Sequence, residues 1–181
     1  MLPLHVHGTA TAAPIERFEA GLRLDPAGRP ATLVAEFRLA GDLMQLAIPP
    51  RVAGHRVDGL WRHTCFELFL RPRAAPGYAE LNLAPSTCWA AYAFDGYRAG
   101  MRPLEPLAPR IDVQAARGEL ALTAEVPLAA LAGATAGVFE AGLSAVIEAR
   151  DGTLTYWALA HPDPLHPDFH HPGSFVHEVR H

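Results

Sequence analysis

Between residues 61 and 94 the sequence alternates apolar and polar residues with a period of two, which is the period of side chains along a β-strand. The alternation is clearest in 64–71 and in 78–83, and the segment between them, 72–77, contains two prolines and a glycine. Such residues end strands. The stretch therefore predicts three consecutive strands joined by turns, the third of them over 89–94.

The two faces of these predicted strands differ in chemistry. Phe66 and the leucines at the next two alternate positions share one face, which we expect to point into a core. Glu67 falls on the opposite face, and the same alternation places Glu80 and Asn82 beside it if the apolar faces share that core. An acidic and amide patch next to aromatic residues is a candidate site for a polar ligand.

Alternation and turn signals mark further strands along the rest of the chain. We expect them over 5–7, 15–24, 31–39, 43–48, 97–101, 111–115, 120–126, 139–148, 154–159 and 175–179. Turn-forming sequences such as Asp25-Pro26-Ala27-Gly28 and Asp95-Gly96 separate them. We expect a single helical turn over 127–131 and a long loop over 51–63.

About ten to twelve short strands with almost no helix predict an all-β fold, an antiparallel sandwich or barrel. The chain of 181 residues is expected to form one domain, 1–181. Its 15 basic and 19 acidic residues leave no basic excess to neutralise phosphates, so we expect no nucleic-acid partner.

The sequence also lacks a run of about 18 apolar residues, the length that a membrane helix needs. The first residues carry neither the positive charge nor the continuous apolar run of a secretory signal. We therefore expect a cytoplasmic protein without a membrane partner, and the sequence predicts no oligomeric state. Two cysteines, Cys65 and Cys88, are too few for a disulfide framework, and we expect buried free thiols.

The segment 161–172, the histidine-rich loop, holds four histidines and four prolines, and these prolines exclude a helix or a central strand. Its histidines are His161, His166, His170 and His171. Imidazole suits zinc, which would make the protein a metal-assisted hydrolase, but the spacing matches no metalloenzyme motif. The alternative is a proline-stiffened loop whose histidines cover strand ends.

Other chemistry has weaker support. Glu67 and Glu80 could form an acid/base pair on adjacent strands, since glycosidases use paired carboxylates. Met44 and Met101, together with the histidines, are candidate axial ligands of a non-covalently bound haem. Trp61 precedes the Glu67 strand and is a candidate ligand contact because aromatic faces bind sugar rings.

Four segments carry a resemblance to a known family: DGLWRHTCFELFL, YAELNLAPSTCWAAYAFDGYR, LTYWALAHP and DFHHPGSF. Together they resemble the DOMON-like domains of bacterial proteins, a group similar to carbohydrate-binding module family 9 and to the DOMON superfamily. The resemblance covers most of the chain from about Trp61 onward. It implies an immunoglobulin-like β-sandwich that binds a sugar or haem on one sheet.

The resemblance also implies site residues. In family 9 modules an aromatic residue precedes a strand glutamate and both contact the sugar, and Trp61 and Glu67 resemble that pair. A second aromatic residue that sandwiches the sugar would be Trp157 or Phe169. The expectation is a non-enzymatic domain that binds a small ligand, with a sugar as the leading class and non-covalent haem as the alternative.

Overall fold

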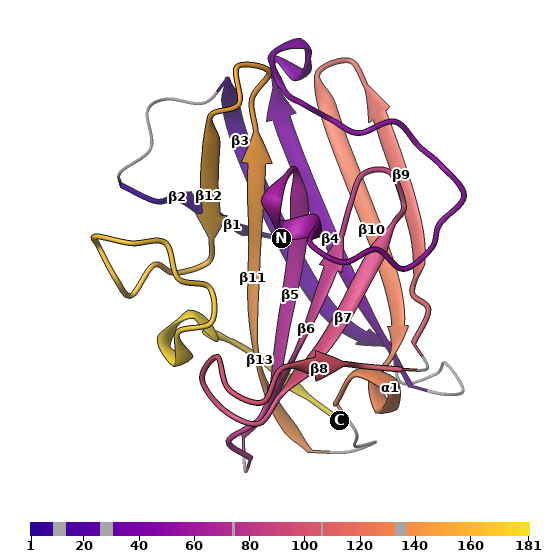
Figure 1. Cartoon of the computed structure of the whole chain (residues 1–181), viewed down its shortest axis with the longest axis vertical. Helices are drawn as coiled ribbons and strands as arrows, with labels where there is room; N and C mark the ends of the chain where they lie inside the picture. The colour runs from indigo at the N-terminus through magenta and orange to yellow at the C-terminus, as the bar shows by residue number, and fades with distance from the viewer. Residues whose placement is uncertain (9–13, 26–30, 74, 106, 133–136) are drawn as a thin grey trace.

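The structure is a computed structural model that describes residues 1–8, 14–25, 31–73, 75–105, 107–132 and 137–181. Two antiparallel β-sheets pack face to face (Figure 1). The five-stranded sheet has the order β1 (Leu2–Pro3), β3 (Ile15–Asp25), β4 (Thr32–Gly41), β10 (Glu119–Pro127), β9 (Arg110–Ala116). This architecture confirms the prediction of an all-β sandwich.

The second sheet has eight strands and carries the features that matter for function. Its order is β2 (His5–Val6), β12 (Leu154–Ala158), β11 (Val138–Glu148), β5 (Cys65–Pro72), β6 (Tyr78–Leu83), β7 (Trp89–Phe94), β8 (Arg102–Pro103), and β13 (His177–Arg180) pairs with β11. The three central strands β5, β6 and β7 are neighbours in both sequence and space. The alternation in 64–71, 78–83 and 89–94 thus predicted the middle of this sheet correctly.

The core lies between the two sheets because each sheet turns its apolar face inward. Phe66, Leu68 and Leu70 of β5 are fully buried there. The Phe66 ring stacks on Phe37 of the opposite sheet with 5.1 Å between ring centroids. Burial of such side chains supplies the main favourable free energy of folding, so the apolar alternation fixes which face of β5 and β6 is left outside.

Two predicted strands are wrong. The segment 43–48 forms a 3-10 turn, η1 (Leu43–Gln45), because the Asp42 carboxylate accepts a hydrogen bond from the Met44 N–H at 3.1 Å. The segment 97–101 does not pair with β7; it continues a turn, and β8 takes the place beside β7. Side-chain capping and a left-handed Arg98, at φ 52°, override the local apolar pattern in these two places.

The helices of the described residues are short. The predicted helical turn is α1 (Leu128–Ala132), and two more 3-10 turns are η2 (Leu60–Arg62) and η3 (Pro172–Ser174). Within the part of the chain that the structure describes, no helix is long and apolar enough to cross a membrane. The predicted turn at 25–28 lies, apart from its first residue, outside the described residues.

Both cysteines are buried free thiols. Cys65 lies on the outer face of β5, as the alternation predicts, and burial raises the pKa of its thiol, which keeps it protonated and unreactive. We expect mass spectrometry under non-reducing conditions to give the mass of the fully reduced chain, and a thiol reagent to titrate two groups after denaturation. A mass lower by two hydrogens would show a disulfide and contradict this prediction.

Three segments cover the outer face of the eight-stranded sheet. They are the loop 51–63, which ends in η2 against β5 and β6, the turn 95–101 after β7, and the histidine-rich loop (Figure 1). Apolar residues of the strands and of these segments form a second buried cluster on this face, separate from the core between the sheets. The polar side chains that the alternation placed outside are therefore shielded from water.

Candidate functional site

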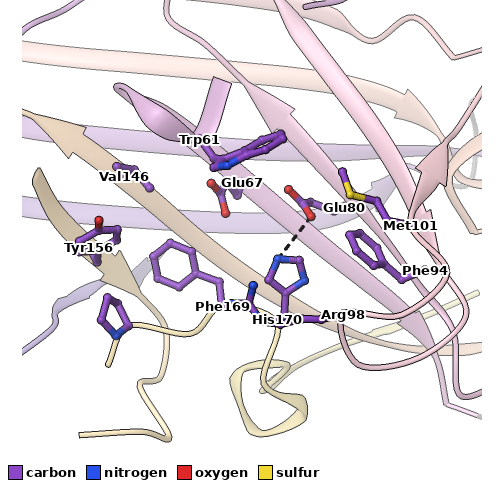
Figure 2. Close-up of a pocket in the computed structure, with 11 residues that line it drawn as sticks. Trp61, Glu67, Glu80, Phe94, Arg98, Met101, Val146, Tyr156, Phe169 and His170 are labelled. Carbon is purple, nitrogen blue, oxygen red and sulfur yellow. Dashed lines mark ion pairs between the residues drawn. The ribbon is translucent and has the colours of Figure 1, made fainter. Parts of the chain in front are cut away.

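A cavity of about 350 Å³ opens on the outer face of the eight-stranded sheet, under the three covering segments. Its lining is mixed in chemistry: two carboxylates, one guanidinium, one imidazole, and several aromatic and apolar groups. The lining residues are Trp61, Glu67, Glu80, Phe94, Arg98, Met101, Val146, Tyr156, Pro167, Phe169 and His170 (Figure 2). Small-molecule sites have volumes of about 300–1,000 Å³, so this cavity suits a small ligand.

The floor of the cavity is acidic. Glu67 of β5 and Glu80 of β6 are only 3% and 4% exposed. The register pairs Glu67 with Asn82 and Glu80 with Phe69, which makes the two glutamates diagonal neighbours on one face. Figure 2 shows both carboxylates pointing into the cavity. The period-two pattern predicted that they share a face, and the structure adds that this face is buried.

The two carboxylates differ in their hydrogen bonds. Asn82 donates from Nδ2 to Glu80 Oε1 at 2.7 Å. His170 Nε2 lies 3.6 Å from Glu80 Oε2, a separation longer than a hydrogen bond. Among the described residues, no side chain or backbone group forms a hydrogen bond with the Glu67 carboxylate. Glu67 therefore keeps its hydrogen-bonding capacity for something that enters the cavity.

Burial dominates the acid–base behaviour of the pair. It raises the pKa of Glu67 well above its ordinary value, and the nearby Glu80 carboxylate raises it further. It also raises the pKa of Glu80 to about 7, against hydrogen bonding from Asn82 and the positive charge of Arg98. The empty site thus holds protonated carboxyl groups at pH values where glutamates in water are ionised.

The wall formed by Trp61 is positioned by the loop 51–63. Gly59 begins η2 with a left-handed φ of 79°, which glycine adopts without steric cost. The Trp61 and Tyr92 rings make a T-shaped contact with 5.7 Å between centroids. Tyr92 in turn donates its hydroxyl to Asp58 Oδ1 at 2.5 Å, so the same loop is tied to β7 at a second point.

The opposite wall comes from the histidine-rich loop, which supplies Phe169 and His170 (Figure 2). The backbone N–H of Arg98 donates to the Tyr78 hydroxyl at 3.2 Å, and that hydroxyl lies 2.7 Å from His170 Nδ1. We assign the hydroxyl as the donor to Nδ1, which places the ring proton on Nε2, the nitrogen that faces Glu80. His170 then presents an N–H donor to the cavity.

His170 is held neutral by its surroundings. Its ring packs edge-on against Phe69 and Phe94, each with 5.1 Å between centroids. Burial among these rings, with the positive charge of Arg98 nearby, lowers the pKa of His170 to about 4. Near neutral pH the cavity therefore contains a neutral imidazole rather than a second cation.

Asp168 ties the turn after β7 to the histidine-rich loop. Its Oδ1 accepts hydrogen bonds from Arg98 Nη2 at 2.7 Å and from the His170 N–H at 3.1 Å. Its Oδ2 accepts the Tyr97 hydroxyl at 2.6 Å. The same contact engages the guanidinium of Arg98, so the positive charge beside the cavity is paired with a carboxylate outside it.

This tie gives a prediction about the loop. Asp168→Ala is expected to lower the free energy of unfolding by about 1–2 kcal/mol, because three hydrogen bonds are lost from a partly exposed network. Amide hydrogen exchange in 161–176 should become faster. Asp163→Ala is the matched control, since Asp163 Oδ1 caps Leu165 and His166 within the same loop and does not reach the cavity. Equal effects of the two substitutions would contradict this role.

The four histidines proposed for a metal do not converge. His161 Nε2 lies 2.8 Å from the His5 carbonyl, and His171 Nδ1 accepts from the Gly173 N–H at 3.0 Å. His166 is exposed beside Asp163, while His170 faces Glu80 in the cavity. Over the described ranges, no group of three or more histidine, cysteine, aspartate or glutamate side chains is arranged to hold a metal ion.

The structure brings together most of the residues that the sequence singled out as ligand contacts. Trp61, Glu67, Glu80 and Phe169 all line the cavity. Asn82 is fully buried behind the lining, where it donates to Glu80.

Trp157 was also predicted as a contact, and the structure places it on the other face of its sheet. Its ring packs against Phe18 in the core with 5.6 Å between centroids, and its Nε1 donates to Thr155 Oγ1 at 3.0 Å. Adjacent residues of a strand face opposite sides, so it is Tyr156, next to it in β12, that reaches the cavity.

Some lining residues were missed from the sequence. Arg98 and Met101 come from the turn after β7, where the apolar pattern suggested a strand. His170 was considered as a metal ligand, and Met101 as a haem ligand, without a link to the two glutamates. The Asp95-Gly96 turn begins the segment that carries Arg98, but nothing in the sequence pattern links Arg98 to the two glutamates.

Comparison with known proteins assigns the fold. No protein-family profile and no curated protein sequence matches the chain. Among solved structures, it is similar to a candidate carbohydrate-binding protein from Bacteroides uniformis, with a TM-score of 0.59 and 11% identity over 99% of this chain and 84% of the other. It is also similar to a carbohydrate binding module family 9 from Caldicellulosiruptor kristjanssonii in complex with glucose, with a TM-score of 0.51 and 9% identity over 99% and 83%.

Proposed function

We propose that the cavity on the eight-stranded sheet binds a small carbohydrate and that the protein is a binding domain rather than an enzyme. The observation that carries the proposal is the placement of aromatic walls, Trp61 and Phe169, on either side of two buried carboxyl groups in one cavity of about 350 Å³ (Figure 2). Sugar rings have apolar faces and polar edges, so they are recognised by aromatic surfaces combined with a few hydrogen-bonding groups.

Each lining group has a role in this proposal. Trp61 covers the face of a sugar ring, and Phe169 contacts it from the opposite wall. Glu67 and Glu80 exchange hydrogen bonds with hydroxyl groups, which can donate to a carboxylate or accept from a carboxyl group. His170 donates from Nε2 to a hydroxyl oxygen.

The structural comparisons support this ligand class. Both neighbours share the fold along nearly the whole chain, one is described as a candidate carbohydrate-binding protein, and the other was solved with glucose. The DOMON-like resemblance of the sequence favours the same class. Trp61 and Glu67, the pair that this resemblance singles out, line one cavity.

The carboxyl pair does not by itself support glycoside hydrolysis. Hydrolysis by paired carboxylates needs one group ionised while the other stays protonated. Here burial raises the pKa of both Glu67 and Glu80. Raised pKa values alone do not assign one carboxyl group as the acid and the other as the ionised partner.

Haem binding, the alternative ligand, fits the residues less well. Met101 and His170 both line the cavity. However, the imidazole nitrogen that faces the cavity is His170 Nε2. It lies 3.6 Å from Glu80 Oε2, and this oxygen occupies the position that an iron ion bound to Nε2 would need. The other nitrogen of His170 is 2.7 Å from the Tyr78 hydroxyl. His170 therefore does not fit as an axial haem ligand.

The experiment is calorimetric titration with a panel of sugars that includes glucose, galactose, mannose, xylose and cellobiose. We expect at least one to bind the wild-type protein, and Phe169→Ala to weaken that binding about tenfold through loss of one aromatic wall. Leu165→Ala is the control, because Leu165 lies in the same loop, is 71% exposed and does not line the cavity. Absence of binding across the panel at millimolar sugar would overturn the proposed function, and Soret absorbance after addition of haemin would point to the alternative.

A further inference from the structure

The charges around the cavity are not balanced within the protein. Glu67 and Glu80 both point into it. The positive group nearest to them, Arg98, forms an ion pair with Asp168 at 2.7 Å. Because His170 stays neutral, ionisation of the two glutamates leaves net negative charge in a region shielded from water.

Glu67 presents a carboxyl group to the cavity that no described residue pairs with. It is 3% exposed, it lines the cavity, and no described residue forms a hydrogen bond with its carboxyl group. Buried polar groups in folded proteins are nearly always hydrogen-bonded, and an unsatisfied carboxylate is costly. A donor that belongs to the ligand would meet this requirement, and a charged donor would meet it best.

The walls point to the same kind of donor. Trp61, Phe94, Tyr156 and Phe169 place four aromatic rings around the space above the carboxyl groups. The faces of aromatic rings are negative, and they attract organic cations, most strongly in the case of tryptophan. Aromatic walls over two acidic groups form a site for an ammonium group. A ligand with hydroxyl groups alone would neither neutralise the negative charge of ionised Glu67 and Glu80 nor interact as a cation with the aromatic faces.

We propose that the cavity selects ligands that carry a protonated amine, so that among sugars it prefers amino sugars to their neutral counterparts. This inference rests on the proposed function, which it narrows to a ligand class. Glu67 and Glu80 receive the ammonium group, the aromatic walls surround it, and His170 and Arg98 are left to contact the oxygen atoms of the sugar.

Proton balance gives the proposal an independent readout. In the empty cavity the pKa of both glutamates is raised, so a neutral carboxyl group is present near pH 7. When an ammonium group binds, it favours the carboxylate, and the displaced proton passes to the buffer. Other titratable or charged groups lie near this pair on the strands and on two of the covering segments: Cys65, Tyr78 and Tyr92 on β5, β6 and β7, Arg98 in the turn after β7, and Asp168 and His170 in the histidine-rich loop.

The test compares glucose, glucosamine and N-acetylglucosamine by calorimetry near pH 7. A fourth ligand, 6-amino-6-deoxyglucose, carries the amine at a different position of the sugar. At least one amino sugar is expected to bind about tenfold or more tightly than glucose, the effect of one charge-assisted hydrogen bond. N-acetylation removes the charge and should abolish the advantage at that position. Titrations in buffers of different ionisation enthalpy should show proton release for the amino sugar and none for glucose.

Two substitutions locate the effect. Glu67→Gln and Glu80→Gln keep the size of the side chain but remove the ionisable group, so each should reduce both the amine preference and the proton release. Glu36→Gln, on the five-stranded sheet, is the matched control and should change neither.

The outcomes separate this inference from the proposed function. If glucose and the amino sugars bind equally well and without proton release, the amine inference is wrong while carbohydrate binding stands. If no sugar binds but ethanolamine, a protonated amine without a sugar ring, binds in the same titration, amine recognition is supported and carbohydrate binding is overturned. If an amino sugar is preferred but Glu67→Gln and Glu80→Gln leave the preference intact, other groups recognise the ammonium charge. The assignment of amine recognition to this cavity is then wrong.

Discussion

Replacing Trp61 by alanine is expected to weaken binding of the best sugar by a factor of ten or more, at least about 1.4 kcal/mol. The indole forms one wall of the cavity, and its removal takes away the largest apolar surface that a sugar ring could cover there. The melting temperature should change by only a few degrees, because Trp61 is half-buried, lies outside the core between the sheets, and makes a T-shaped contact with Tyr92.

Two further variants test whether the aromatic face of Trp61 accounts for the loss of binding. Trp61→Phe keeps an aromatic face and should recover most of the affinity. Met44→Ala removes a side chain that is 74% exposed on η1, away from the cavity, and should leave binding unchanged. If Trp61→Ala stays folded and binds the sugar as tightly as wild type, the role of Trp61 as a ligand contact is wrong. If Trp61→Ala unfolds, a folded Trp61→Leu variant that lacks the aromatic ring and still binds as tightly as wild type would lead to the same conclusion.

The second large effect is on stability as a function of pH. The pKa of Glu67 and Glu80 is raised in the folded protein, so between the unfolded value of 4.5 and the folded values the folded state binds more protons than the unfolded state. Stability from these groups is complete below about pH 4.5 and is lost as the pH rises through their folded pKa, about 7 for Glu80 and higher than the ordinary range for Glu67.

His170 acts in the opposite direction at lower pH. Its pKa falls from 6.5 to about 4, so its contribution is present above pH 6.5 and is lost as the pH falls toward 4. Between pH 4.5 and 6.5 the glutamates and His170 change the free energy of unfolding in opposite directions. Above pH 6.5, of these three groups, only Glu67 and Glu80 still change it. We therefore expect the free energy of unfolding to fall by on the order of 2 kcal/mol from about pH 6.5 to 8.

Chemical denaturation at a series of pH values measures this directly. The double variant with Glu67→Gln and Glu80→Gln should show a much flatter profile above pH 6.5 and should be more stable than wild type at pH 8, because its neutral amides need no solvation of charge. A wild-type profile that is flat or rises over this range would contradict the buried, protonated state of the pair. A steep decline that persists in the double variant would assign it to other groups.

Much of the fold follows from the sequence for a simple reason. A strand with one face in the core repeats its apolar side chains every second residue, so 64–71, 78–83 and 120–126 predict both the strands and the faces they bury. The same rule places Glu67 and Glu80 together. The rule fails where a side chain competes with the ladder for backbone hydrogen bonds, as Asp42 does at η1.

The rest of the site depends on contacts between distant segments, which leave no periodic signal. Arg98 and His170 meet through Tyr78 and Asp168, although they are far apart in the sequence. The misplacement of Trp157 has a different cause. The pattern of 154–159 contains aromatic residues on both faces, and the choice between Tyr156 and Trp157 depends on which face the opposite sheet covers.

The most direct test of the proposed site is a nuclear magnetic resonance titration that follows the indole N–H signals of the three tryptophans. Single substitutions to phenylalanine assign the signals, and the tightest-binding sugar is added to the labelled protein. The signal of Trp61, which lines the cavity, is predicted to shift with saturation, while that of Trp157, hydrogen-bonded to Thr155 in the core, stays in place. A ligand that binds without moving the Trp61 signal, or that moves the Trp157 signal instead, would contradict the cavity as the binding site.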